Sequence, residues 1–253
     1  MIFLVKPATP PEVLKDNYEE WTRNLLQAVS EYGGYRKVPK QLKANLIANY
    51  RHEDIKNTLF AMSNKKCAFC ESKPAESGNI EVEHFIPKSE YPHLTFDWGN
   101  FLPVCRKCNE SKGALDTLKE PIVNPTKVNP EDFFKFNDIR ICIREGAQDR
   151  DIAQRTVREL GLNNPRLLKA RAELLIHLSS YIESLNKWFE EIESSETPRK
   201  RHNRIRNLRD SIESIEMLIE PTEKYTAFSR DFIKDSEEYK RAKMIVDEEL
   251  IGQ

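Results

Sequence analysis

Two Cys-x-x-Cys pairs, Cys67/Cys70 and Cys105/Cys108, carry the clearest chemistry in this chain of 253 residues. A gap of two residues makes each pair a knuckle whose sulfurs can reach one metal ion. Four thiolates fill a tetrahedral zinc shell and leave no position open for water, so the predicted zinc site is structural rather than catalytic. The alternative is two unrelated pairs of buried thiols. Zinc is favoured because two such pairs in an intracellular chain rarely serve another purpose.

A Glu-His pair, Glu83 and His84, lies in the segment between the two knuckles. A histidine beside a carboxylate can act as a general base near neutral pH, and the carboxylate can bind a hard divalent cation. Asn109 follows the last cysteine, and Lys112 lies three residues further on, so both share one face if Asn109 opens a helix. Asparagine offers a neutral oxygen ligand, and lysine can hold a phosphate. Alone, His84 would be interpreted as a buried, hydrogen-bonded histidine; in this company, catalysis is favoured.

At these positions the sequence resembles the HNH, or ββα-metal, nuclease superfamily. Its pattern is an Asp/Glu-His pair, a central Asn, and a His or Asn in the helix after a second Cys-x-x-Cys, here Glu83-His84, Asn100 and Asn109. The resemblance implies that His84 activates water and that Glu83 and Asn109 bind a catalytic Mg²⁺ or Mn²⁺. It also implies that Asn100 orients the loop that carries His84. The sequence departs from the commoner pattern twice, with Glu in place of Asp at 83 and Asn in place of His at 109.

The chain further resembles the PtuB family, the nuclease subunits of Septu and retron-associated antiphage systems. The resemblance lies in the proline-rich opening, in E-P-I-V-N-P-T at 120–126 and in T-V-R-E-L-G-L-N-N-P-R-L-L-K-A-R at 156–171. It implies an ABC-type ATPase partner, PtuA-like, and a role in defence against bacteriophage. The chain has no Walker A sequence, so ATP-driven regulation would have to come from such a partner.

The charge balance bears on how a nucleic acid would bind. Forty basic and 41 acidic residues give a net charge of -1, so binding must depend on a local patch, a metal site or a partner chain. Arg106, Lys107 and Lys112 lie nearest the predicted site and are the predicted contacts to substrate phosphate. The basic run at 199–206 is either a second phosphate contact or the solvated start of a helix, and the sequence leaves both open.

The sequence predicts no association with a membrane. No apolar run approaches the roughly 20 residues that span a bilayer, and Met1–Val5 is too short for the apolar region of a signal peptide. We therefore expect a cytoplasmic protein. The resemblances imply that it is bacterial and that its partners are nucleic acid and an ATPase subunit.

The predicted fold class is α+β and mostly α-helical, with a zinc-stabilised ββα-metal core between helical N-terminal and C-terminal regions. Residues 1–62 are predicted to form an N-terminal arm and helical scaffold, and 63–125 the HNH nuclease core with its four-cysteine zinc site. Residues 126–253 are predicted to form a short hairpin and then a helical region that offers faces for partner docking.

Local signals predict where the elements begin and end. A helix is expected from a Thr9 cap, and a second over Pro39–Phe60, with apolar residues at helical spacing. Asn137-Asp138 is predicted to turn a β-hairpin. Asn164-Pro165 should start a long helical hairpin with a break at 194–198, and one final helix is expected near 229–249.

The site residues predict a metal-dependent HNH endonuclease, and the resemblance to the PtuB family implies that it is the effector of a defence complex with an ABC-type ATPase. Two alternatives stay open from the sequence. A stand-alone restriction-type endonuclease would cut as a single chain. A non-catalytic zinc adaptor would dock nucleic acid or a regulator, although an adaptor has no use for a base beside a ligand for a hard metal.

Overall fold

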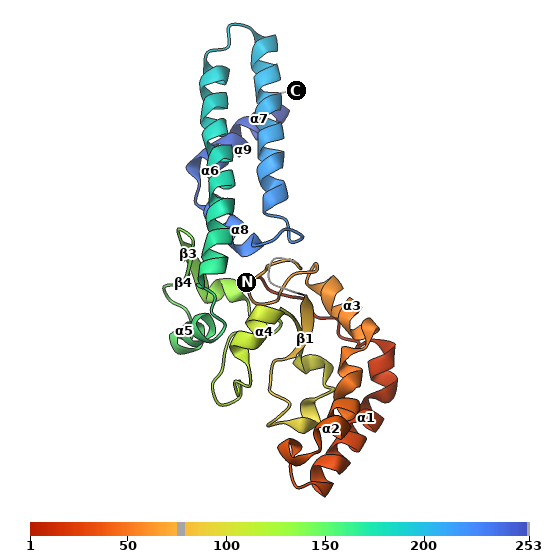
Figure 1. Ribbon diagram of the computed structural model, residues 1–253. Helices are drawn as coiled ribbons and strands as arrows, with labels where there is room; N and C mark the ends of the chain where they lie inside the picture. The colour runs from red at the N-terminus through yellow and green to blue at the C-terminus, as the bar shows by residue number, and fades with distance from the viewer. Residues whose placement is uncertain (75–78, 252–253) are drawn as a thin grey trace. The chain divides into compact units, whose positions relative to one another are not determined.

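The computed structural model describes residues 1–74 and 79–251 (Figure 1). Contacts divide the chain into two compact units, which we call the first and the second unit. The first unit comprises Met1–Phe134 and Ile143–Asn163, and the second comprises Lys135–Cys142 and the chain from Asn164 onward. The chain is mostly helical and has two small antiparallel sheets among the described residues. This confirms the predicted α+β class. The three-part division at residues 62 and 125 stays a prediction.

Three helices near the N-terminus pack together in the first unit, and the third of them contacts the strands Ile80–His84 and Phe101–Cys105 (Figure 1). They are α1 (Glu12–Glu31), α2 (Lys40–Ile47) and α3 (Glu53–Met62), with the short 3-10 turns η1 (Tyr35–Lys37) and η2 (Ala48–Arg51) between them. Their apolar side chains join residues of the two strands and of the connection between the strands in one core cluster: Leu14, Leu25, Tyr50, Ile55, Leu59, Val82, Phe96, Trp98 and Phe101. The helices therefore supply most of the apolar surface that the small sheet needs for stability.

Two of the predicted helix boundaries are wrong. The first helix is capped at Pro11, not Thr9, and no side chain caps it. Helical backbone geometry is disfavoured for a residue that precedes a proline. Pro10 precedes Pro11, so the helix does not begin at Pro10. The predicted single helix over 39–60 is interrupted by η2 and restarts at Glu53. There, His52 is extended and its Nδ1 accepts a hydrogen bond from the backbone N–H of Asp54.

The centre of the first unit is a β-β-α arrangement. Strands β1 (Ile80–His84) and β2 (Phe101–Cys105) pair antiparallel, in a register that runs from Ile80 opposite Cys105 to His84 opposite Phe101. Helix α4 (Arg106–Lys112) follows β2 directly. The connection between the strands contains the 3-10 turns η3 (Pro92–Leu94) and η4 (Trp98–Asn100). This arrangement places the residues of the predicted core on adjacent elements.

The N-terminal segment is an extended arm that holds the connection near Asn100. The Lys6 ammonium donates to the backbone oxygens of Trp98, at 2.5 Å, and of Phe101. In return the Trp98 indole N–H donates to the Pro7 oxygen at 2.8 Å. Burial lowers the pKa of Lys6 to about 7. The arm thus fixes the backbone on both sides of Asn100.

The remaining elements among the described residues are a hairpin, five α-helices and one 3-10 turn. Strands β3 (Phe134–Asn137) and β4 (Arg140–Ile143) form the predicted hairpin, with Asp138 at a φ of 49° in its turn. In the second unit α6 (Pro165–Glu193) and α7 (Pro198–Leu218) run side by side as the predicted helical hairpin (Figure 1). The others are η5 (Pro130–Asp132), α5 (Arg150–Glu159), α8 (Thr226–Lys234) and α9 (Glu237–Ile251).

Two predictions for the second unit have different outcomes. The predicted start of α6 is confirmed, because Asn164 caps the helix through Leu167 N–H and Pro165 is its first residue. The single final helix predicted near 229–249 is wrong. Ser236 divides that segment into α8 and α9, because its hydroxyl caps the second helix by accepting from the Tyr239 N–H at 3.1 Å.

No helix within residues 1–74 and 79–251 combines the length and the apolar character that crossing a membrane requires.

The helical hairpin should depend on its buried apolar seam. Leu185 on α6 is fully buried, whereas Ile176 on the same helix is 69% exposed. We expect Leu185→Ala to lower the free energy of unfolding of the second unit by about 2–5 kcal/mol. Ile176→Ala is the matched control and should change it by at most about 0.5 kcal/mol. Urea denaturation followed by circular dichroism measures both, and equal effects of the two substitutions would contradict the observed packing.

Candidate active site

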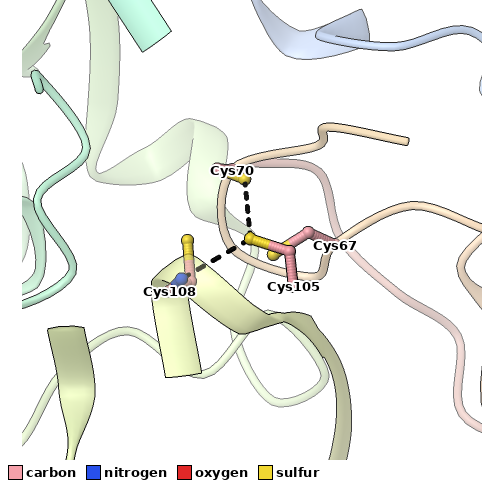
Figure 2. Close-up of side chains that lie close together, drawn as sticks. All are labelled: Cys67, Cys70, Cys105 and Cys108. Atoms are coloured by element: carbon pink, nitrogen blue, oxygen red, sulfur yellow. Dashed lines mark hydrogen bonds between the residues drawn. The ribbon is translucent and has the colours of Figure 1, made fainter. Parts of the chain in front are cut away.

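The four cysteines of the two knuckles meet in one buried cluster (Figure 2). Their sulfurs all lie within 4.8 Å of one another, and the sulfurs of Cys70 and Cys105 are 3.7 Å apart. Burial raises the pKa of the Cys67 thiol well above its ordinary value, and a bound cation would oppose that effect by favouring the thiolate. Four converging, buried sulfurs are the donor set that tetrahedral zinc prefers, so the cluster could hold that ion.

Each knuckle is shaped by the elements that flank it. The first is a turn after α3, closed by Glu71 at a φ of 62° and joined to β2 by a hydrogen bond of 2.8 Å from Ala68 N–H to the Pro103 oxygen. The second knuckle begins at the end of β2, where the Cys105 sulfur caps α4 by accepting from the Cys108 N–H at 3.5 Å. A metal at this cluster would therefore connect the segment after α3 to the β2–α4 junction.

A buried cluster of charged groups flanks the first knuckle. Lys66 and Glu71 are both buried, and the Lys66 ammonium lies 3.7 Å from one carboxylate oxygen of Glu71. The ammonium of Met1 contacts the other oxygen. Sequence reasoning missed these residues, because nothing in their types indicates that charged residues flanking a Cys-x-x-Cys pair are buried.

Two side chains of β1 each accept a hydrogen bond from a side chain of α4. Glu81 and Glu83 alternate along β1 and share one face, while Asn109 and Lys112 lie almost one turn apart on α4. The Asn109 amide nitrogen donates to Glu81 at 2.6 Å, and the Lys112 ammonium donates to Glu83 at 2.7 Å. The Glu81 contact fixes the orientation of the Asn109 amide, which leaves its oxygen as the atom available to a cation.

Glu83 and Lys112 form a buried ion pair. Glu83 is 7% exposed and Lys112 is 3% exposed. Burial raises the pKa of Glu83, and the Lys112 ammonium acts against that shift. Lys112 also donates to the backbone oxygen of His84 at 2.9 Å. The Lys112 ammonium thus faces the protein interior. Its contact with substrate phosphate stays a prediction, and this arrangement does not support it.

His84 is held in one tautomer. Its Nε2 lies 2.9 Å from the backbone oxygen of Thr95, which can only accept, so Nε2 carries the hydrogen. Nδ1 then carries the lone pair, and the Lys88 ammonium lies 3.4 Å from it. The ring packs edge-on against Tyr50 and Phe101, with centroids 4.6 Å and 5.2 Å away. Burial, and next the charge of Lys88, lower the pKa of His84 to about 3. The imidazole is therefore neutral at physiological pH.

Asn100 joins the two ends of the loop that follows His84. Its side-chain oxygen accepts from the Ile86 N–H at 2.7 Å, and its amide nitrogen donates to the oxygens of Ile86 and Leu94 at 3.0 and 3.1 Å. Its backbone oxygen accepts from the Phe85 N–H at 2.8 Å. These contacts can orient the loop next to His84, which is the role that the HNH resemblance implies.

A cavity of about 320 Å³ brings Glu83, His84 and Asn109 together, whereas Asn100 does not line it. Its other lining residues are Tyr35, Tyr50, Arg51, Val82, Pro87, Lys88, Ser89, Lys112, Gly113 and Ala114. No motif in the sequence indicates Arg51, Lys88 or Glu81. Only Glu81 had a usable signal, because strand alternation places it on the same face as Glu83.

The two remaining predicted phosphate contacts lie outside this cavity. Arg106 and Lys107 are exposed on α4, and both pair with Glu110, at 3.0 and 3.1 Å. Arg106 lines a neighbouring cavity of about 840 Å³, and Lys107 lines neither of the two.

Comparison with known proteins identifies the region that contains this site. Residues 67–115 match the family model described as HNH endonuclease. The chain is 49% identical over 83 residues to the Septu protein PtuB of Bacillus thuringiensis, a match that covers 32% of each chain. It is 26% identical over 156 residues to the Septu protein PtuB of Bacillus mycoides (strain KBAB4), which covers 49% of this chain and 52% of the relative. The matches thus span about a third and about half of the length of these relatives.

Loss of one cysteine should empty the predicted zinc site. We expect Cys105→Ser to lose bound zinc and to lower the melting temperature, because the metal would join two segments that are distant in sequence. Cys142→Ser is the matched control, since Cys142 lies outside the cluster. Metal analysis of the purified variants and their melting curves give the readout. A Cys105→Ser variant that keeps its zinc and its melting temperature would contradict the assignment.

The buried pair predicts an effect on stability without substrate. Lys112→Met leaves the Glu83 carboxylate buried without its cation, which should cost about 3 kcal/mol of unfolding free energy. Lys107→Met on the same helix removes only an exposed ion pair and should leave the unfolding midpoint unchanged. Denaturant titration of the free protein distinguishes the two. If Lys112 served only to bind phosphate, both variants would unfold at the midpoint of the parent.

Proposed function

We propose that this chain is a metal-dependent endonuclease that hydrolyses phosphodiester bonds in nucleic acid, as the nuclease subunit of a bacterial antiphage complex. The observation that carries the proposal is the meeting of Glu83, His84 and Asn109 around one small cavity. All but three of the residues that line this cavity lie in the segment that matches the HNH endonuclease model.

His84 is the proposed general base. Its neutral imidazole has a lone pair on Nδ1 that can accept a proton from an attacking water molecule. The hydrogen bond from Nε2 to the Thr95 oxygen holds the tautomer and stabilises the imidazolium as it forms. Lys88 contacts Nδ1 in the free protein, and no carboxylate among the described residues forms an ion pair with it. Its ammonium can therefore turn toward a substrate phosphate and release Nδ1 for the water.

Glu83 and Asn109 are the proposed ligands of a catalytic Mg²⁺ or Mn²⁺. They fit a hard cation because both present oxygen atoms to the same cavity, and Lys112 engages only one oxygen of the Glu83 carboxylate. Glu81 holds the amide nitrogen of Asn109, as residues behind a metal ligand commonly do. When bound, the ion supplies charge stabilisation at the phosphate and the leaving oxygen. The four cysteines would hold a separate, structural zinc.

The proposed partner is an ABC-type ATPase subunit, PtuA-like. Two relatives named Septu protein PtuB support this assignment, together with the absence of a Walker A sequence from the chain. The proposed place of action is the bacterial cytoplasm, where both a nucleic-acid substrate and ATP are available.

Replacement of the proposed base tests the function. We expect His84→Ala to lower Mg²⁺-dependent cleavage at least about 100-fold while the protein stays folded, because the attacking water loses its proton acceptor. His93→Ala is the matched control, since His93 is exposed and lines neither cavity. Cleavage of plasmid DNA and of total tRNA is measured for the chain alone and after co-expression with a PtuA-like ATPase.

The outcomes separate the candidate functions. Cleavage that requires the ATPase and His84 supports the defence nuclease, and cleavage by the chain alone supports a stand-alone enzyme. A folded His84→Ala protein with full activity would overturn the assigned mechanism. No cleavage of either nucleic acid in any combination would favour the zinc adaptor.

A further inference from the structure

A second, larger cavity adjoins the candidate active site. It has a volume of about 840 Å³ and shares Tyr50, Arg51, Val82 and Asn109 with the smaller one. Its remaining lining residues come from α3, from the first two residues of β1, from α4, and from Pro74 and Asn79, all within the first unit. Because the two cavities share lining residues, a ligand extending from the site beside His84 can continue into the larger cavity.

Two cations on the α3 side of this cavity have no carboxylate partner. The Arg51 guanidinium donates to the Tyr50 hydroxyl at 3.0 Å, and Lys56 is half-buried on α3. Within residues 1–74 and 79–251, no carboxylate forms an ion pair with either of them. Many other cations of the first unit are paired, among them Arg36 with Glu90 and Lys119 with Asp116. Cations that line a cavity without a neutralising carboxylate attract an anionic ligand to it.

The acidic residues of this cavity are already engaged. Glu110 is shared between Arg106 and Lys107, and Glu81 accepts from the Asn109 amide. Among the described lining residues, the three cations Arg51, Lys56 and Arg106 exceed the two carboxylates by one positive charge, although the chain as a whole is at -1. Arginine can grip a phosphate with two parallel hydrogen bonds, and lysine can hold one as a point charge.

We infer that the larger cavity holds the phosphodiester backbone next to the bond that is cut, with Arg51 at the junction of the cavities and Lys56 further along. The inference rests on the proposed nuclease function and extends it to residues outside the HNH segment. It assigns the η2–α3 region a part in substrate binding, beyond the scaffold role that the sequence indicates. The chemistry recognised is the phosphate backbone, which DNA and RNA share.

The test compares Arg51→Ala and Lys56→Ala with matched controls. Arg23→Ala and Lys15→Ala remove the same residue types from exposed positions on α1 that line neither cavity. All variants carry His84→Ala so that no substrate is cut, and the ATPase partner is added where cleavage requires it. Binding of a fluorescein-labelled DNA duplex and of a labelled tRNA is followed by fluorescence anisotropy over a series of salt concentrations.

We expect each cavity variant to bind nucleic acid several-fold more weakly than the parent. The affinity of each variant should also depend less steeply on salt concentration. Each lost phosphate contact should lower the slope of log affinity against log salt by about 0.9 on duplex DNA and by about 0.7 on single strands. The controls should match the parent in affinity and slope, and all melting temperatures should agree. The nucleic acid on which the loss is larger identifies the natural source of the backbone.

The outcomes distinguish this inference from the proposed function. If wild type cleaves in a His84-dependent way but Arg51→Ala and Lys56→Ala bind like their controls, this inference is wrong and the nuclease assignment stands. If wild type neither binds nor cleaves either nucleic acid, the proposed function fails and the inference fails with it.

Discussion

The buried ion pair between Glu83 and Lys112 joins strand β1 to helix α4, and the geometry of the candidate site follows from it. Burial alone would favour a neutral Glu83, so the ammonium is what keeps a charged carboxylate compatible with the interior. The same ammonium binds the backbone oxygen of His84 and so fixes the end of β1. One interaction thereby sets a proposed metal ligand and a proposed base at the same time.

The pair would be too weak a support by itself, because a sheet of two strands has little stability in water. Three other sets of contacts in the first unit support the small sheet. Helices α1 and α3 cover the sheet with apolar side chains, a metal at the four cysteines would join the segment after α3 to the β2–α4 junction, and Lys6 holds the turn that carries Asn100. The site thus lies on a framework whose parts come from distant stretches of sequence, as precise positioning of reactive groups requires.

The sequence was sufficient for features that depend on spacing. The Cys-x-x-Cys pairs predicted a cluster that the structure forms, and an Asn-Pro pair predicted the start of α6. Features that depend on tertiary contacts were out of reach. The residue type of Lys112 suggested a phosphate contact, whereas its position beneath β1 directs the ammonium to Glu83. Arg51 gave no signal, because its place at the junction of the two cavities depends on how η2 packs against β1.

Strand alternation has a consequence for changes in chain length. Glu81 and Glu83 face α4, while Val82 between them lies in the apolar core. Insertion or deletion of a single residue within β1 would exchange these two faces, placing carboxylates among aromatic rings and an apolar side chain against Asn109. The five residues of β1 therefore form a segment of fixed length. Exposed helix-to-helix connections, such as the one between α6 and α7, can vary in length at much smaller cost.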